Sequence, residues 1–85
     1  AEIGRLTSLK GLNLDHNQLT SVPAEIGQLK SLKVLDLRGN QLRNLPAEIG
    51  QLTSLERLNL YNNQLTSRGA AIRKLEAAGC FVIPY

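Results

Sequence analysis

The 85-residue chain contains no methionine and no tryptophan, one cysteine, Cys80, and only three aromatic residues, Tyr61, Phe81 and Tyr85. A lone cysteine excludes an internal disulfide and favours a reducing compartment such as the cytoplasm. No apolar run approaches the roughly 18 to 20 residues that a membrane-spanning helix needs, and no secretory signal pattern is present. The scarcity of aromatic residues argues against a core built around aromatic rings.

An excess of charge of one sign is also missing. Ten Lys and Arg residues stand against seven Asp and Glu residues, which gives a formal net charge of +3. Only Arg68, Arg73 and Lys74 cluster along the chain, and this is a weak basis for binding nucleic acid or a membrane surface. We therefore expect no nucleic-acid partner and no membrane partner. Salt-dependent binding to a polyanion would contradict that expectation.

Leucine is abundant and periodic, filling 17 of the 85 positions. Residues 6–28 and 29–51 align without gaps at a period of 23 and agree at 15 of 23 positions, and a third copy runs from Leu52 until it diverges at Arg68. Each copy contains the pattern L-x-x-L-x-L-x-x-N-x-L. The instances are Leu9, Leu12, Leu14, Asn17 and Leu19, then Leu32, Leu35, Leu37, Asn40 and Leu42, then Leu55, Leu58, Leu60, Asn63 and Leu65.

The chain resembles the leucine-rich-repeat family over nearly its whole length, and its repeats are similar to 23-residue repeats of the intracellular Ras-associated and plant signalling type. The resemblance implies an α/β fold, a leucine-rich-repeat solenoid in which a short curved parallel sheet is backed by helical or irregular convex segments. It also implies a structural asparagine ladder of Asn17, Asn40 and Asn63, a non-catalytic role in protein binding and signalling, and a cytoplasmic location without a cofactor.

The residues support the same architecture independently of the resemblance. The L-x-L alternation predicts a half-buried strand in each copy, and one connection per strand makes successive strands parallel. Pro23 and Pro46 are expected to start short helical turns. Ile26 and Ile49 then point inward, and the glycines that follow them are expected to end those turns.

We predict one domain over residues 1–85. Residues 1–5 are expected to end a preceding repeat, 6–28, 29–51 and 52–67 to form repeats, and 68–85 to form a degenerate closing repeat and C-terminal cap. Because residues 1–4 repeat the sequence of 24–27, we expect a C-terminal fragment of a longer array, or the ordered portion of a longer chain.

Within the closing repeat, Ala70 to Ala78 is predicted to form a helix that ends at Gly79, and Phe81 to Ile83 a last strand. Phe81 and Ile83 fall 23 residues after Leu58 and Leu60. They are therefore expected to point into the core, and Cys80 to be a buried or half-buried thiol.

The strand residues that alternate with the core leucines define a second surface, here called the concave face. It comprises Gly11, Asn13, Asp15, Val34, Asp36, Arg38, Arg57, Asn59 and Tyr61. Eight positions differ between the first two copies, and four of them lie on or beside this face. Such variation on a constant frame is typical of a binding surface, although unrestrained exposed positions would vary as well.

We predict partner-binding residues on this face. They are Asp15, Val34, Asp36, Arg38, Arg57, Asn59 and Tyr61. One row places Asp15, Arg38 and Tyr61 side by side, and Arg and Tyr are enriched in interface hot spots. The alternative is that Asp15, Asp36 and Arg38 only pair with one another.

Catalysis and metal binding find little support in these residues. His16 is the single histidine and has no Ser or Cys nucleophile at a comparable strand position. No phosphate-binding glycine loop and no Cys and His metal spacing occurs, so we expect no catalytic residue, no metal site and no cofactor.

The leading hypothesis is a non-catalytic module that binds a protein partner of unknown identity on the concave face. The alternative is a truncated or consensus-like repeat scaffold without a function of its own. Such a scaffold would self-associate as a homo-oligomer through the uncapped apolar end from Leu6 to Leu14.

Overall fold

The structure, a computed structural model, describes residues 5–65 and 69–83. The predicted end of a preceding repeat, apart from Arg5, lies outside the described residues. So do the predicted boundary between residues 67 and 68, Arg68 of the basic cluster, and Tyr85.

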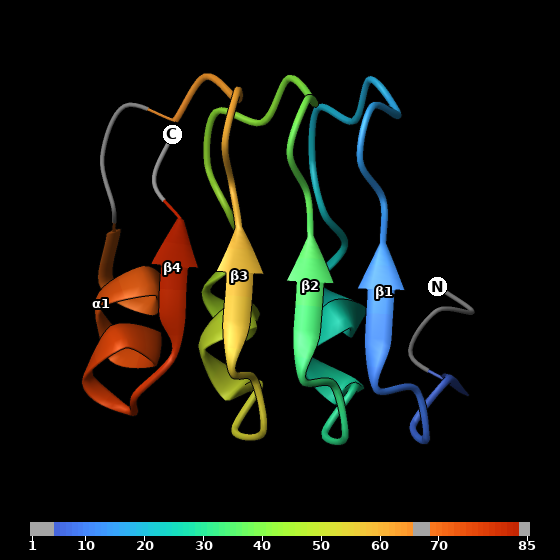
Figure 1. The fold of residues 1–85 in the computed structure, drawn as a ribbon, viewed down its shortest axis with the longest axis vertical. Coiled ribbons are helices and arrows are strands. Elements are labelled where there is room, and N and C mark those ends of the chain that lie inside the picture. The colour runs from blue at the N-terminus through green and yellow to red at the C-terminus, as the bar shows by residue number, and fades with distance from the viewer. Residues whose placement is uncertain (1–4, 66–68, 84–85) are drawn as a thin grey trace.

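Four short strands form one parallel sheet in the order β1-β2-β3-β4 (Figure 1). They are β1 (Gly11–Asn13), β2 (Val34–Asp36), β3 (Arg57–Asn59) and β4 (Phe81–Ile83). The first three arise from the L-x-L segments, whose period of two turns the leucines to one side of the sheet. The predicted parallel sheet is confirmed.

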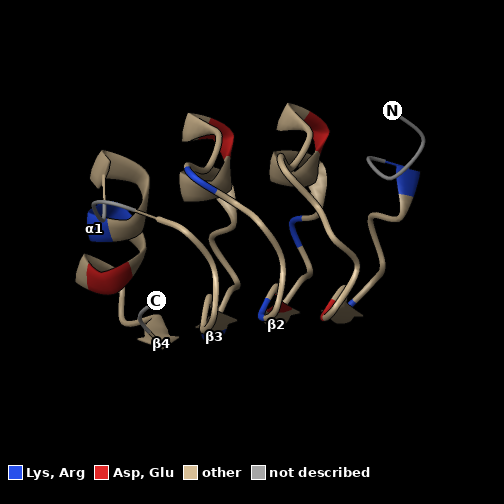
Figure 2. Ribbon diagram, turned by 90° about the horizontal axis from the view of Figure 1, so that it is seen from above, with Lys and Arg blue, Asp and Glu red and all other residues tan. Residues whose placement is uncertain are grey.

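A helical layer covers the side of the sheet to which the leucines turn (Figure 2). Among the described residues it includes the 3₁₀ helices η2 (Ala24–Gln28) and η3 (Ala47–Gln51) and the α-helix α1 (Gly69–Ala77). Pro23 and Pro46 precede the 3₁₀ helices, and their carbonyl oxygens accept the N–H groups of Ile26 and Ile49, both at 3.1 Å. Proline lacks the N–H that a first helical turn leaves unbonded, so it suits this place.

The sequence predicted that Gly27 and Gly50 end the 3₁₀ helices, and this prediction is wrong. Gly27 and Gly50 are buried inside the helices, which continue to Gln28 and Gln51. A Cβ atom on Gly27 would stand 2.6 Å from the backbone oxygen of Glu48 in the next helix. The absence of a side chain on Gly27 therefore allows η2 and η3 to stack closely.

The core consists of leucine and isoleucine layers between the sheet and the helices. In the second copy the four motif leucines are fully buried, namely Leu32, Leu35, Leu37 and Leu42. Their counterparts in the first copy are only partly buried, namely Leu9, Leu12, Leu14 and Leu19. The leucine layer of the first copy is thus less covered than the layer of the second copy.

Asparagine side chains join neighbouring copies where the chain leaves the sheet. Asn63 Nδ2 donates to the carbonyl oxygens of Leu37 and Leu60 at 2.9 and 3.1 Å, and Asn63 Oδ1 accepts from Leu42 N–H at 3.1 Å. Asn40 makes the corresponding contacts one repeat earlier. These bonds satisfy backbone groups of the turns that the sheet leaves unpaired.

Helix α1 starts one residue before the predicted range and presents Ile72 and Leu75 to the core, each 2% exposed. It ends in a Schellman motif, in which Cys80 N–H donates to Leu75 C=O at 2.9 Å and Gly79 N–H to Glu76 C=O at 3.0 Å. Gly79 has φ 98°, a left-handed value that glycine adopts without strain. Cys80 itself is buried, as expected.

The prediction that Phe81 and Ile83 point into the core is wrong. Strand β4 pairs with β3 at an offset of 24 residues, so that Phe81 lies beside Arg57 and Val82 beside Leu58. The connection through α1 is one residue longer than the connections through the 3₁₀ helices, and a shift of one residue exchanges the two faces of a strand. Val82 packs against the core, and Phe81 is 63% exposed.

Candidate functional site

The concave face is the side of the sheet opposite the helices, and its residues form rows across the strands. One row holds Gly11, Val34, Arg57 and Phe81, and the next holds Asn13, Asp36, Asn59 and Ile83. Because neighbouring strands lie about 4.8 Å apart, adjacent residues within a row are in contact range.

A third row continues past the strand ends. His16 N–H donates to Arg38 C=O at 3.0 Å, and Gly39 N–H donates to Tyr61 C=O at 2.9 Å. This parallel hydrogen bonding keeps Asp15, Arg38 and Tyr61 in register, as the 23-residue period requires.

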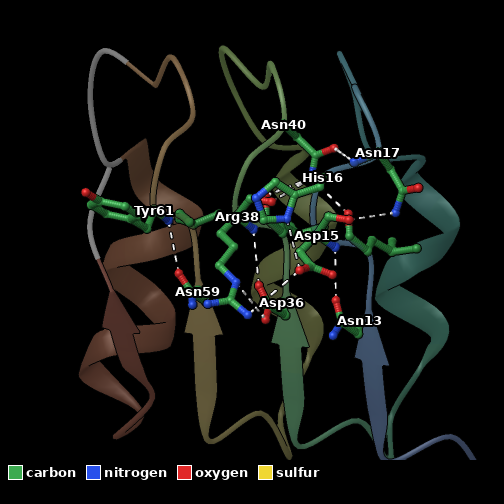
Figure 3. Close-up of polar contacts among 12 residues, drawn as sticks. Asn13, Asp15, His16, Asn17, Asp36, Arg38, Asn40, Asn59 and Tyr61 are labelled. Atoms are coloured by element: carbon green, nitrogen blue, oxygen red, sulfur yellow. Dashed lines mark hydrogen bonds and ion pairs between the residues drawn. The ribbon is translucent and has the colours of Figure 1, made fainter.

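The side chains of the second row close a turn at the end of each of the first three strands. The Oδ1 atoms of Asn13, Asp36 and Asn59 accept the backbone N–H two residues later, at 3.0, 3.2 and 3.1 Å (Figure 3). Asp and Asn are suited to this turn because their short side chains reach their own backbone. The Oδ1 atoms of Asp36 and Asn59 are thus already hydrogen-bonded to the backbone of their own chain.

The residue after each third-row position adopts a left-handed conformation. The φ values are 56° at His16, 71° at Gly39 and 63° at Asn62. The imidazole of His16 lies over Gly39, where a Cβ atom would stand 2.8 Å from the ring. Gly39 therefore suits both the backbone conformation and the limited space.

Four charged or ionisable side chains meet in the N-terminal half of the concave face (Figure 3). Arg38 Nε lies 3.4 Å from Asp36 Oδ2, and Arg38 Nη2 lies 3.8 Å from Asp15 Oδ2. His16 Nδ1 lies 3.1 Å from the same Asp15 oxygen. Arg38 thus faces two carboxylates, and the mutual pairing considered from the sequence is present in the structure.

The part of the concave face around Arg57, from Val34 on β2 to Phe81 on β4, is different in character. Val34, Tyr61 and Phe81 are 41%, 62% and 63% exposed. Arg57 is also exposed, and it lies in the first row between Val34 and Phe81. Apolar side chains on the two adjacent strands therefore flank the cation of Arg57.

Comparison with known proteins identifies the fold family. A family profile described as "Leucine-rich repeat region" matches residues 1–78. The chain belongs to the leucine-rich-repeat family. No match was found among curated proteins.

A solved leucine-rich-repeat protein of Leptospira interrogans is similar to this chain, with 46% sequence identity and a TM-score of 0.87. The match covers 96% of this chain and 20% of the other, so the chain spans about a fifth of that protein's length. Leucine-rich-repeat folds generally serve as non-catalytic scaffolds for protein interaction.

The histidine and the cysteine of the chain, His16 and Cys80, lie in different surroundings. The imidazole of His16 has a side-chain exposure of 71%, and Asp15 is its hydrogen-bond partner among the described residues. Burial, and after it the negative charge of Glu76, raises the pKa of the Cys80 thiol, which disfavours a reactive thiolate.

Residues 5–65 and 69–83 contain neither a candidate metal site nor a candidate membrane-spanning helix. Within these ranges no three or more His, Cys, Asp and Glu side chains group in a way that could hold a metal ion. The helices in the same ranges are too short or too polar to cross a membrane.

An apolar pocket of about 390 Å³ opens beside the leucine layer of the first copy. It is lined by Leu14, Asn17, Leu19, Ser21, Val22, Pro23 and Ile26. Leu6, in the same copy, is 49% exposed. These features belong to the end of the repeat stack that the sequence predicted to associate.

Phe81 and Ile83 are the concave-face residues that the sequence analysis missed. Residues 68–85 contain no L-x-L segment, and their alignment depended on the 23-residue spacing alone. Gly79 was the available signal, because a helix that ends at a glycine sets the start of the following strand.

Proposed function

We propose that this leucine-rich-repeat module binds a protein partner on its concave face. The supporting observation is that the repeats keep their buried frame while the concave face changes from small polar residues around Gly11 to exposed Arg57, Tyr61 and Phe81. Arg and aromatic residues are the side chains on which interface binding energy most often depends.

The predicted binding residues contribute unequally to this proposal. Asp15, Asp36 and Arg38 form a paired cluster that supplies shape and polar contacts, since the charge of Arg38 is already balanced. Asn59 holds the turn before Tyr61, whereas Val34, Arg57 and Tyr61 offer exposed surface. We place the module in the cytoplasm, which suits the free thiol of Cys80.

The test is partner capture followed by measurement with purified proteins. The immobilised chain is used to capture proteins from the organism that encodes it, and the dissociation constant of the captured partner is then measured by calorimetry. The double variant Arg38→Ala, Tyr61→Ala should bind about tenfold more weakly or worse. The control Arg43→Ala removes an exposed charge in the loop between β2 and η3 and should bind like the wild type. Unchanged binding by the double variant would overturn the proposal.

Self-association through the N-terminal end is a second candidate, favoured by the pocket beside Leu14 and by the exposure of Leu6. A second copy would cover this apolar surface. Sedimentation equilibrium should then show a mass that rises with concentration, and Leu6→Glu should hold the chain as a monomer. Val34→Glu, a matched change of an exposed aliphatic residue on the concave face, should behave like the wild type. A wild-type mass independent of concentration would rule this candidate out.

A further inference from the structure

The shifted register of β4 creates a surface that we call the C-terminal patch. It comprises Val34, Arg57, Tyr61, Phe81 and Ile83. Leu60 N–H donates to Ile83 C=O at 3.1 Å, which brings the segment that carries Tyr61 alongside β4. With the predicted 23-residue offset, the patch would have lost both Phe81 and Ile83 to the core.

Arg57 is the only cation of the C-terminal patch, and no ion pair involving it occurs among the described residues. Glu56, its neighbour in sequence, lies 3.5 Å from Lys33 instead. Arg38, on the adjacent strand segment, is occupied by Asp15 and Asp36. The positive charge that the concave face can offer to another molecule is therefore concentrated at Arg57.

The neighbours of Arg57 in its row indicate which partner side chains can pack beside a group that pairs with the guanidinium. Val34 and Phe81 flank it on adjacent strands and are 41% and 63% exposed. A partner that covers these apolar side chains also removes water from around the guanidinium, which strengthens an ion pair formed there. A carboxylate can accept two parallel hydrogen bonds from a guanidinium, which adds directional specificity.

We propose that the C-terminal patch binds a protein segment that carries an Asp or Glu carboxylate between apolar side chains. The carboxylate pairs with Arg57, and the apolar side chains pack on Val34 and Phe81. The inference rests on the proposed function and narrows it, since it names the chemistry of the partner and the part of the concave face that binds it.

The experiment is a selection of random peptides displayed on phage against the immobilised full chain, with sequencing of the bound pool. A bound peptide is then synthesised with its Asp or Glu intact and with the corresponding Asn or Gln. Both are titrated against the ¹⁵N-labelled chain, and amide shifts are followed by NMR. We expect enrichment of an acidic residue flanked by apolar residues and shifts at the backbone amides of Val34, Arg57 and Phe81.

Matched variants separate the patch from the rest of the surface. Arg57→Gln and Phe81→Ala should each weaken binding of the acidic peptide about tenfold. Arg43→Gln removes one positive charge elsewhere and should bind like the wild type. The Asn or Gln peptide should bind wild type more weakly than the acidic peptide, and this difference should disappear in Arg57→Gln.

The outcomes distinguish this inference from the proposed function. Peptides that lack acidic residues but lose binding in the double variant Arg38→Ala, Tyr61→Ala would overturn the inference and leave concave-face binding in place. Acidic peptides that bind Arg57→Gln as tightly as they bind the wild type would also overturn the inference. Selection of no peptide that binds the concave face would count against both.

Discussion

The Oδ1 atom of Asn40 accepts the backbone N–H of Asn17, 23 residues earlier in the chain, at 3.0 Å. The same oxygen accepts Leu19 N–H at 2.9 Å, and Asn40 Nδ2 donates to the carbonyl oxygens of Leu14 and Leu37 at 3.0 and 2.8 Å. One buried carboxamide therefore fastens the turn of the first copy to the turn of the second.

Replacing Asn40 by Ala should lower the free energy of unfolding by roughly 3 kcal/mol, because it leaves several buried backbone groups without partners. Urea denaturation followed by circular dichroism measures this loss. Asn17→Ala is the matched control: Asn17 is exposed, and its side chain donates to Asp15 C=O at 3.2 Å. Its replacement should cost less than about 1 kcal/mol, and equal costs for the two variants would contradict the account.

Gly27→Ala should destabilise the chain by about 1 to 3 kcal/mol, because the added Cβ would meet the backbone oxygen of Glu48 at 2.6 Å. Backbone on the facing helix can yield only if η2 and η3 move apart. Gly50→Ala provides the comparison, since its Cβ would meet Lys74 Cδ at 3.3 Å, on a flexible side chain. Thermal denaturation should show a clear decrease in Tm for Gly27→Ala and little change for Gly50→Ala.

The register of β4 predicts that truncating the smaller side chain, Val82, lowers the free energy of unfolding more than truncating the larger one, Phe81. Val82→Ala should lower the free energy of unfolding by about 1 to 2 kcal/mol, since Val82 packs against the core. Phe81→Ala should cost less than about 1 kcal/mol, although it removes the larger side chain, because that side chain is 63% exposed. Chemical denaturation of both variants measures the two free energies of unfolding. A greater decrease for Phe81→Ala than for Val82→Ala would support the 23-residue register.

Cys80 should react slowly with a thiol reagent while the chain is folded. Burial and the charge of Glu76 raise its pKa, so less thiolate is present near neutral pH than in the unfolded chain. Since the folded pKa lies above the unfolded value, the stability that Cys80 contributes is present below the unfolded pKa and is lost as pH rises through the folded pKa.

Ellman's reagent provides the measurement, with the rate in buffer compared with the rate in urea at the same pH. The rate should be lower in buffer and should increase at alkaline pH. In parallel, the free energy of unfolding of the wild type should decrease at alkaline pH more than that of Cys80→Ala. Equal reaction rates in buffer and urea would show that the thiol is accessible.

The sequence predicts the repeating part of the fold because one physical pattern determines it. Leu12, Leu35 and Leu58 occur at a fixed period, and alternation around each of them settles the strand, its direction and its neighbours. Phe81 breaks this inference, because the length of the preceding helix, rather than a repeated leucine, sets its face.

The candidate site was predictable as a surface but not as a set of contacts. The alternation placed Arg38 and Arg57 on the same face, and the period placed them on adjacent repeats. That Arg38 pairs with Asp15 and Asp36 while Arg57 does not depends on side-chain conformations over a few ångströms. Hydrophobic patterning carries no information at that scale, and neither does it show the close approach of Glu48 to Gly27.

The 24-residue offset of β4 has a consequence for how this surface can change over evolution. Deleting one codon in the helix connection would restore the 23-residue spacing and turn Phe81 and Ile83 inward and Val82 outward. The three leucine repeats would keep their amino-acid sequence. A single insertion or deletion event in the terminal unit is thus enough to replace an exposed aromatic side chain on the concave face by an aliphatic one, without any substitution in the repeats themselves.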